Sequence, residues 1–121
     1  MTKISYDHPA IRIHHEAIRG VAMAFGQNHI KPFHLATEDD INGTVSMMQS
    51  WIDKPAMTPE DGWKAWKQIK AEQGWTYNAV RNNELKHHPL MVESYDQLPA
   101  FEKAKDYVSR AVSLAVVGLS A

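Results

Sequence analysis

Apolar residues return along the first half of the chain at the spacing of amphipathic helices. Between Ala10 and about Phe25 the steps are mostly three and four residues, and Gly26 follows as a terminator. A second series of the same period begins after Thr37, whose hydroxyl can cap a helix, and three acidic residues fill its first turn, where the helix dipole favours them. The pattern therefore predicts two helices, which form an N-terminal helical part over residues 10–53. The core positions that it predicts are Ile11, Ile13, Ile18, Val21, Ala22 and Phe25 in the first helix, and Ile41, Val45, Met47, Met48 and Ile52 in the second.

A third helix is predicted from Thr58 to about Gln73, with Gly74 as its left-handed terminator. Thr58 can cap it, Pro59 suits the first helical position, and Asp61 is placed to complete a capping box. Two of its apolar residues are tryptophans, and one is enough to anchor the helix. The second is therefore either additional core or a platform on which a planar ligand stacks. The large apolar residues on this side are Trp63, Trp66 and Ile69.

The segment after this helix begins with alternating aromatic residues. Trp75 and Tyr77 at period two predict a short extended segment with both rings on one buried face. A basic and imidazole cluster follows and ends at Pro89, which favours extended geometry at the residue before it. We expect residues 90–92 to form a short buried strand that pairs with residues 75–80 as a β hairpin. Aromatic rings beside cations suit a planar anionic ligand such as a nucleotide, and they equally suit the edge of an ordinary core.

A last helix is predicted from Phe101 to about Gly118. Residues 111–119 are nearly all apolar, which is more than one helix face needs, so this end can face a second subunit. Four helices around a short hairpin make the predicted fold α+β and mainly helical, as a single domain over residues 1–121. The core stripe predicted for the last helix is Phe101, Ala104, Val108, Ala111, Val112 and Ala115.

The first helix also carries a polar run, His14, His15 and Glu16, with Arg19 one turn later. His15 and Arg19 share a helix face, and Glu16 is placed for an i,i+3 ion pair with Arg19. The run is either a solvated face that holds one hydrogen-bonded histidine or a set of side chains that faces a ligand. Together with the histidines at positions 29 and 34, it matches no metal-binding spacing, so we expect neither a metal site nor a cofactor.

Composition narrows the classes of function. The 121 residues include no cysteine, which excludes disulfides and thiolate metal sites. The formal net charge is -1 with acids and bases interleaved, so we expect no nucleic-acid polymer as a partner. No apolar run approaches the roughly 20 residues of a membrane span, and the N-terminus lacks the form of a signal peptide. We therefore expect a soluble protein of the cytoplasm with no membrane partner.

Several anchor residues stand in a fixed order over residues 58–118. They are Trp66, the GWTY run at 74–77, the KHHPLMV run at 86–92, the YDQLP run at 95–99, and Lys103 with Asp106. By the order and spacing of these anchors, the chain resembles the family of ryanodine receptor repeats, the RyR domains. Through Ile11, His15, Glu16 and Arg19, the first helix is similar to the IxxxHExxR opening of short, single-repeat members from phages and bacteria.

Three positions depart from the family pattern. Trp63 and Lys64 stand where a histidine and a glutamate often precede the helical tryptophan, and Asn78 replaces the glycine after Tyr77. Asparagine tolerates positive φ, so the turn can survive. Lys64 either changes the charge of the preferred ligand or removes a polar contact of the family.

The resemblance implies non-catalytic binding of a nucleotide or a nucleotide-derived signal, as a sensor or a sponge, which in a phage would serve counter-defence in the host cytoplasm. In the receptors, paired repeats are associated with adenine-nucleotide binding near the helical tryptophans, and a single-repeat chain can reproduce the pair as a homodimer. Aromatic rings would stack on the base, while arginine, lysine and histidine would hold phosphate. The ligand-binding residues that we expect are Trp63, Trp66, Tyr77, Arg81, Lys86, His88 and Tyr95.

Two other functions stay open on the sequence. One is a structural or protein-interaction module without a small-molecule ligand. The other is catalysis, for example phosphodiester hydrolysis by Lys86 with His87 or His88. Catalysis needs a positioned acid and base, and the sequence shows no recognised spacing for them, so we do not expect an enzyme.

Overall fold

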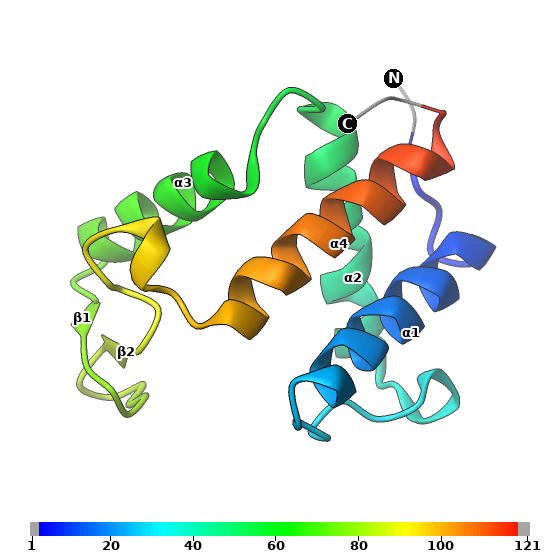
Figure 1. The fold of residues 1–121 in the computed structure, drawn as a ribbon. Coiled ribbons are helices and arrows are strands. Elements are labelled where there is room, and N and C mark those ends of the chain that lie inside the picture. Colours follow the sequence, from blue (N-terminus) through cyan, green and yellow to red (C-terminus); the bar gives the residue numbers. More distant parts are fainter. Residues whose placement is uncertain (1–2, 119–121) are drawn as a thin grey trace. The chain divides into compact units, whose positions relative to one another are not determined.

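The computed structural model describes residues 3–118, and within them the chain is mainly helical with one small sheet (Figure 1). The predicted class, a mainly helical α+β fold, is confirmed. The chain forms two compact units, one holding α1, α2 and most of α4, the other made of residues 58–100. The elements in order are α1 (Pro9–Ala24), the 3-10 turn η1 (Phe33–Leu35), α2 (Glu38–Asp53), α3 (Pro59–Glu72), β1 (Thr76–Tyr77), β2 (His87–His88), the 3-10 turn η2 (Tyr95–Gln97) and α4 (Ala100–Val116).

Side-chain caps fix where the first three helices begin. His8 accepts a hydrogen bond from the Ala10 backbone N–H at its Nδ1, 3.0 Å away. Thr37 and Thr58 each form a complete capping box with the aspartate three residues later. Each box satisfies two backbone N–H groups that the helix itself leaves without partners. These starts agree with the sequence predictions because capping is a local interaction.

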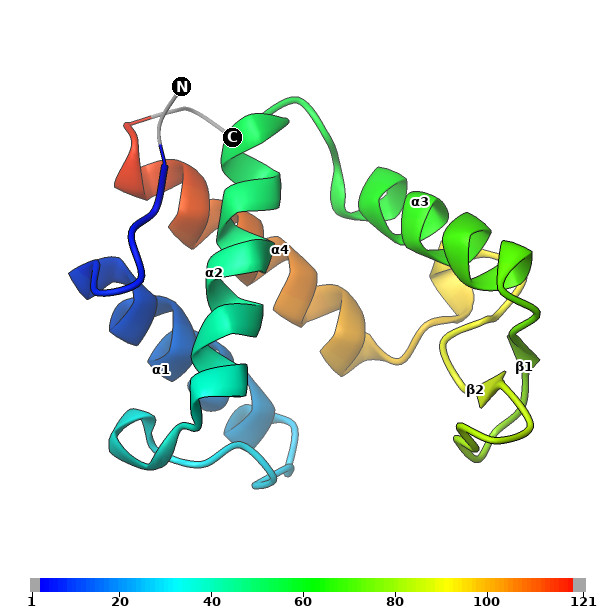
Figure 2. The ribbon, with the colours of Figure 1, turned by 180° about the vertical axis from the view of Figure 1, so that it is seen from behind.

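The core of the helical unit lies between α1 and α2, which cross in the view of Figure 2. The buried face of α1 runs through Ala10, Ile11, His14, Ile18 and Ala22. The predictions of Ile13 and Phe25 as core residues are wrong, since Ile13 is 61% exposed and Phe25 is exposed as well. Ile13 lies about 200° around the helix from Ile11, because each residue turns the chain by about 100°. Met47 is also exposed, while the buried cluster consists of Ile4, Ala10, Ile11, Met48 and Ile52.

The buried face of α4 differs from the predicted apolar stripe. Ser109 and Ser113 are fully buried, whereas Ala111 and Ala115 are exposed. Much of the apolar C-terminal end packs within its own unit, where Leu114 is buried and residues 116 and 117 join the core between α1 and α2. Leu119, the last residue of the predicted apolar run, lies outside the described residues. The homodimer expected from this run stays a prediction.

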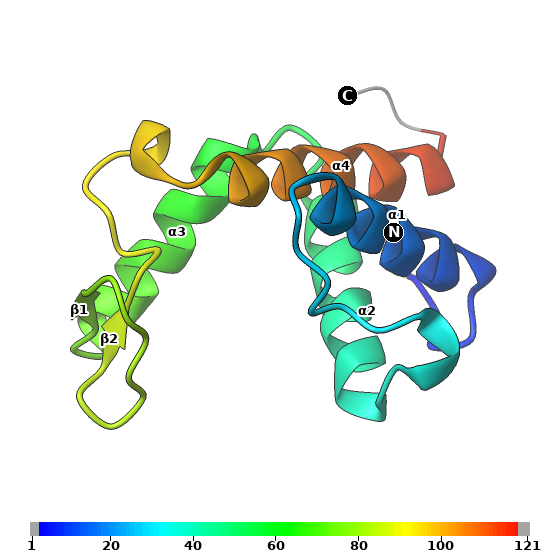
Figure 3. The ribbon, with the colours of Figure 1, turned by 60° about the horizontal axis from the view of Figure 1, so that its bottom comes forward.

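A buried serine joins the three long helices of this unit, which Figure 3 shows from a second direction. The Ser109 hydroxyl lies 2.7 Å from Nε2 of His14 on α1 and accepts the indole N–H of Trp51 on α2 at 3.1 Å. Burial lowers the pKa of His14 to about 4, and the charge of His15 adds to the effect, so His14 is neutral at pH 7. A small polar residue therefore occupies a core position because two neighbouring helices bring polar groups to it.

The two strands pair in parallel, with Thr76 opposite His87 and Tyr77 opposite His88. A hairpin joins antiparallel neighbours, so the predicted hairpin and its strand over residues 90–92 are wrong. Residues 78–86 loop back before β2, and the Met91 N–H donates to the His88 carbonyl in a turn that Pro89 opens. Tyr77 is exposed, so it does not share a buried face with Trp75.

We predict that Ser109→Ala lowers the free energy of unfolding by about 2–4 kcal/mol, because it leaves a buried indole N–H and a buried imidazole nitrogen without their partner. Ser113→Ala is the matched control. The Ser113 hydroxyl donates only to the Ser109 backbone carbonyl, at 2.8 Å, so its loss should cost less than about 1 kcal/mol. Urea unfolding of both variants measures the difference, and equal losses would contradict this role of Ser109.

We also predict that Asp106→Asn stabilises the protein at pH 7 and not below pH 4. Burial raises the pKa of the Asp106 carboxyl to about 6. The negative charge of Glu102 also raises this pKa, while the positive charge of Lys105 lowers it. The folded state therefore holds a proton that the unfolded chain releases near its ordinary value of 3.8, so this contribution to stability is complete below pH 3.8 and is lost as the pH rises through 6. We expect a gain of about 1–2 kcal/mol at pH 7, after allowing for partial solvent screening.

Urea unfolding of wild type and Asp106→Asn from pH 4 to 7 tests this prediction. Taking the difference between the two proteins removes the contribution of His14, whose lowered pKa acts in the opposite direction over the same range. Asp7→Asn, at an exposed carboxylate, controls for the loss of one negative charge. A gain that is independent of pH would show that Asp106 is not the titrating group.

Candidate functional site

Trp63 anchors the unit formed by residues 58–100. It is buried, and its indole N–H donates to the Leu90 backbone carbonyl at 3.0 Å. Its ring meets Tyr95 edge to face at a centroid distance of 5.9 Å, and Leu98 completes the buried cluster. Trp66, one turn later on α3, is only half-buried and packs at the margin of this cluster. Of the two tryptophans, Trp66 is the one that the core needs less.

His88 lies buried between two indole rings. The ring centroids of Trp66 and Trp75 are 5.0 Å and 5.9 Å from that of His88, both edge to face. Its Nδ1 accepts the Leu90 backbone N–H at 3.1 Å, so the turn after Pro89 holds the imidazole in place. His88 is predicted to bind phosphate, but its ring is buried and does not offer the exposed edge that a surface histidine would present to such a ligand.

A left-handed turn positions the aromatic residues that follow α3. Gly74 has φ +91°, and Lys86 has φ +56° and donates from Nζ to the Gln73 carbonyl at 2.6 Å. The Thr76 N–H donates to the Lys86 carbonyl at 2.9 Å, which ties β1 to the far end of the loop. Among the non-glycine residues within 3–118, Lys86 has a positive φ and Asn78 does not. The Asn78 side chain instead accepts the Val80 N–H at 3.0 Å. Lys86, predicted to bind phosphate, thus stabilises the end of a helix.

Two further predicted residues lie exposed on the loop between the strands. Tyr77 is exposed, and Arg81 is exposed with its Nε donating to the Asn83 side chain at 3.1 Å. Val80 and Leu85 are exposed on the same loop, Val80 to 73%. The loop therefore presents a mixed apolar and cationic surface.

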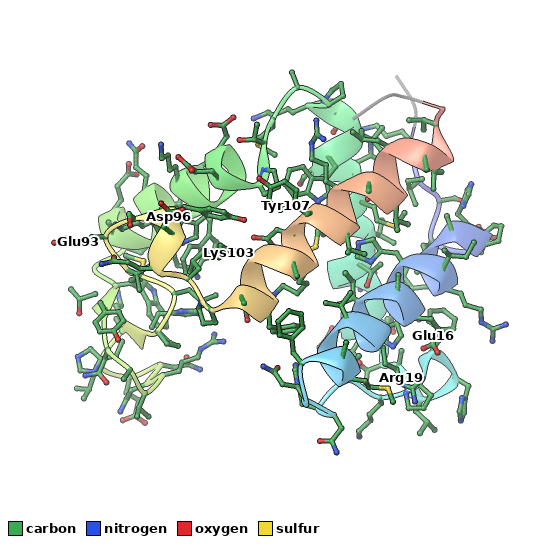
Figure 4. All side chains as sticks on the ribbon, in the orientation of Figure 1. Glu16, Arg19, Glu93, Asp96, Lys103 and Tyr107 are labelled. Carbon is green, nitrogen blue, oxygen red and sulfur yellow. The ribbon has the colours of Figure 1, made fainter. Side chains whose placement is uncertain are left out.

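A groove of about 390 Å³ lies between α3 and the chain around η2. Lys67 places its ammonium 5.1 Å from the centre of the Trp63 ring and 3.4 Å from the Glu93 carbonyl oxygen. Lys64 pairs with Glu60 at 2.9 Å, and this hydrogen bond and the charge of Glu60 raise the pKa of Lys64. Glu93 and Asp96 lie on the chain around η2 (Figure 4). The groove is lined by Glu60, Trp63, Lys64, Lys67, Gln68, Ala71, Glu93, Ser94, Tyr95 and Asp96.

The structure divides the predicted site residues into three sets. Trp63 and Tyr95 line the groove. Trp66 and His88 contact each other, while Tyr77, Arg81 and Lys86 lie outside the groove lining. Sequence reasoning missed Lys67 and Ser94 as groove residues. The signal for Lys67 was its position four residues after Trp63, which puts both on one helix face.

The groove offers three kinds of contact to a ligand. Aromatic carbon lies at its floor, since Trp63 and Tyr95 are both almost fully buried there. Two ammonium groups and the Ser94 hydroxyl can donate hydrogen bonds, and three carboxylates can accept them. A volume of this size falls within the range of small-molecule sites.

The fold and the groove define a small helical α+β module with a ligand-sized recess. The model of one family, the RyR domain, matches residues 44–117, and the chain belongs to that family. Searches of curated proteins and of solved structures find no match. Among the described residues, none of the helices has the length and apolar character that crossing a membrane requires.

We predict that Gly74→Ala destabilises the protein by about 1–2 kcal/mol, because a side chain at φ +91° strains the backbone. Gly43→Ala is the opposite control. Gly43 lies inside α2. Apart from its two chain neighbours and the nearby backbone of its own helix, no atom of the described residues lies within 4 Å of the place where an alanine methyl would stand, so alanine should stabilise the helix by about 0.5–1 kcal/mol. Thermal unfolding compares the two variants, and an unchanged midpoint for Gly74→Ala would show that the turn tolerates a side chain.

Proposed function

We propose that this RyR domain protein binds a nucleotide or a nucleotide-derived signal in the groove of residues 58–100 and does not alter it chemically. The observation that carries the proposal is the arrangement of Lys67 over the indole of Trp63, beside Lys64, in a groove of about 390 Å³. An aromatic floor beside ammonium groups suits a planar base joined to a phosphate. The family resemblance points to the same ligand class.

The groove chemistry accommodates each part of a nucleotide. The base would take the place of the Lys67 ammonium against Trp63, where stacking contributes roughly 1–3 kcal/mol per base. The released ammonium, with Lys64, would then meet the phosphate. Glu60 and Glu93 can accept hydrogen bonds from ribose hydroxyls or from an exocyclic amine. The acids thus serve recognition, and the proposal requires no bond to be broken.

In the cell, such a module would act as a sensor or as a sponge for its ligand. If the chain is encoded by a phage, sequestration in the host cytoplasm would serve counter-defence. We propose that it acts as a homodimer, which would set two single repeats side by side as in a tandem pair. Sedimentation at high concentration tests the dimer independently of ligand binding.

We predict that one member of a nucleotide panel raises the melting temperature by about 10 °C at 100 times its dissociation constant. The panel contains ATP, ADP, AMP, ADP-ribose and cyclic mono-, di- and trinucleotides. Lys67→Ala should reduce the affinity about tenfold, since a charge-assisted contact to phosphate is lost. The matched control is Lys70→Ala on the same helix, because Lys70 lies over Trp75 and outside the groove lining, so its affinity should equal that of wild type.

Three outcomes would contradict the proposal in whole or in part. A flat panel with a folded protein would exclude nucleotide binding. Recovery of a hydrolysed ligand after incubation would exclude a non-catalytic role. An affinity that falls for Arg81→Ala and not for Lys67→Ala would keep the ligand class but move the site from the groove to the loop.

The second candidate is a protein-interaction module, favoured by the exposed apolar side chains of the loop between the strands. Tyr77, Val80 and Leu85 are each more than half exposed. The double variant Val80→Ser, Leu85→Ser discriminates between the two functions. Loss of self-association or partner capture, with a flat nucleotide panel for wild type, would establish this second function in place of the first.

A further inference from the structure

The groove between α3 and the chain around η2 carries more acid than base. Among the described residues of its lining, the ammonium groups of Lys64 and Lys67 stand against three carboxylates, so the formal charge is -1. None of these lining residues is an arginine, the side chain that binds phosphate through two parallel hydrogen bonds. A phosphate in the groove would therefore meet only a limited positive charge.

One of the two ammonium groups is already paired with an acid. Lys64 Nζ lies 2.9 Å from a carboxylate oxygen of Glu60, one turn earlier on α3. This hydrogen bond and the charge of Glu60 raise the pKa of Lys64, so the lysine stays protonated at pH 7. A phosphate that approaches Lys64 has to share the ammonium with Glu60. The negative charge of Glu60 stays beside such a phosphate even after the contact is exchanged.

Backbone donors near the groove are also engaged. The N–H groups of Glu93 and Ser94 both donate to the side-chain oxygen of Gln97, at 3.0 Å and 3.1 Å. The N-terminus of a helix attracts anions, but the first turn of α3 already carries the carboxylates of Glu60 and Asp61. These groups are therefore not available to hold a second or a third phosphate.

The size of the groove agrees with a small ligand. Its volume of about 390 Å³ is near the lower end of the range of small-molecule sites, roughly 300–1,000 Å³. A phosphomonoester carries about −1.5 to −2 charges at pH 7, a phosphodiester carries less, and each further phosphate adds to the charge. One ammonium over the Trp63 ring and one shared with Glu60 can offset a single phosphate, but not a chain of them.

We propose that the groove selects nucleotides of low charge, with one phosphate as a monoester or diester, and that Glu60 sets this limit by pairing with Lys64. The inference rests on the proposed nucleotide binding and narrows its ligand class, because nucleoside di- and triphosphates become poor ligands. Glu60 is then a specificity-determining residue. It lowers the affinity for every phosphate, and it does so most for the ligands with the highest charge.

The test measures dissociation constants by isothermal titration calorimetry, without divalent cations, which would neutralise the phosphates. The probes are the cyclic monophosphate, monophosphate, diphosphate and triphosphate of adenosine and of guanosine. For the base that binds, we expect the triphosphate to bind about tenfold more weakly than the monophosphate. Raising the ionic strength should narrow this difference, since salt screens the repulsion. A difference that does not change with salt would overturn the electrostatic origin of the selection.

Glu60→Gln provides the sharper test because we expect a gain of affinity. The change frees Lys64 from its ion pair, so the affinity should rise about threefold for the monophosphate and about tenfold for the triphosphate. A variant that only disturbed the fold would lose affinity. Glu84→Gln is the matched control. It removes the same charge from an exposed position outside the groove lining, so its dissociation constants should equal those of wild type.

The outcomes separate this inference from the proposed function. A triphosphate that binds as tightly as its monophosphate would overturn the inference and leave nucleotide binding in place. Equal effects of Glu60→Gln and Glu84→Gln would likewise overturn the role of Glu60. A series in which no nucleotide binds would contradict the proposed function itself, and this inference with it.

Discussion

The hydrogen bonds of the Ser109 hydroxyl connect α1, α2 and α4 at one point inside the helical unit. Apolar packing holds these helices together but does not by itself fix their rotation. A buried indole N–H and a buried imidazole must each find a partner, and the observed packing of the helices supplies Ser109 to both. The same contact fixes how the buried His14 ring lies, because Nε2 is the ring nitrogen that faces Ser109.

In residues 58–100 a similar buried hydrogen bond joins distant segments, with a tryptophan as the donor. The indole N–H of Trp63 reaches the Leu90 carbonyl, which joins α3 to the chain beyond β2 over a separation of 27 residues. The Tyr95 ring then packs against the same indole. Since Trp63 and Tyr95 also form the floor of the groove, the residues that hold this unit together are the ones that shape its recess.

Sequence reasoning predicted what local interactions determine. The capping boxes at Thr37 and Thr58 and the terminator at Gly74 are set by neighbouring residues, so the helix bounds were correct to within a residue or two. The sequence predictions failed where contacts between residues far apart in the sequence determine the structure. Ser109 and Ser113 are buried because other elements reach them, and the strands pair in parallel because of the loop that separates them. For the candidate site, Trp63 and Tyr95 line the groove, and their part in ligand binding stays a prediction. The burial of His88 could not be predicted, because it depends on two indoles that approach it only in the folded chain.

The surroundings of Lys64 bear on its departure from the family pattern. Lys64 pairs with Glu60 at i,i+4, so the charge it introduces is already offset within α3. Both side chains are about half exposed or more, so solvent screens their attraction and the pair contributes little to stability. A phosphate can compete for the Lys64 ammonium at little cost, which would release Glu60 to accept a hydrogen bond from the same ligand. Relative to the family pattern, the substitution exchanges a carboxylate for an ammonium while Glu60 remains in the groove lining. This exchange supports the proposal of an anionic ligand, and with it a changed ligand charge over a lost contact.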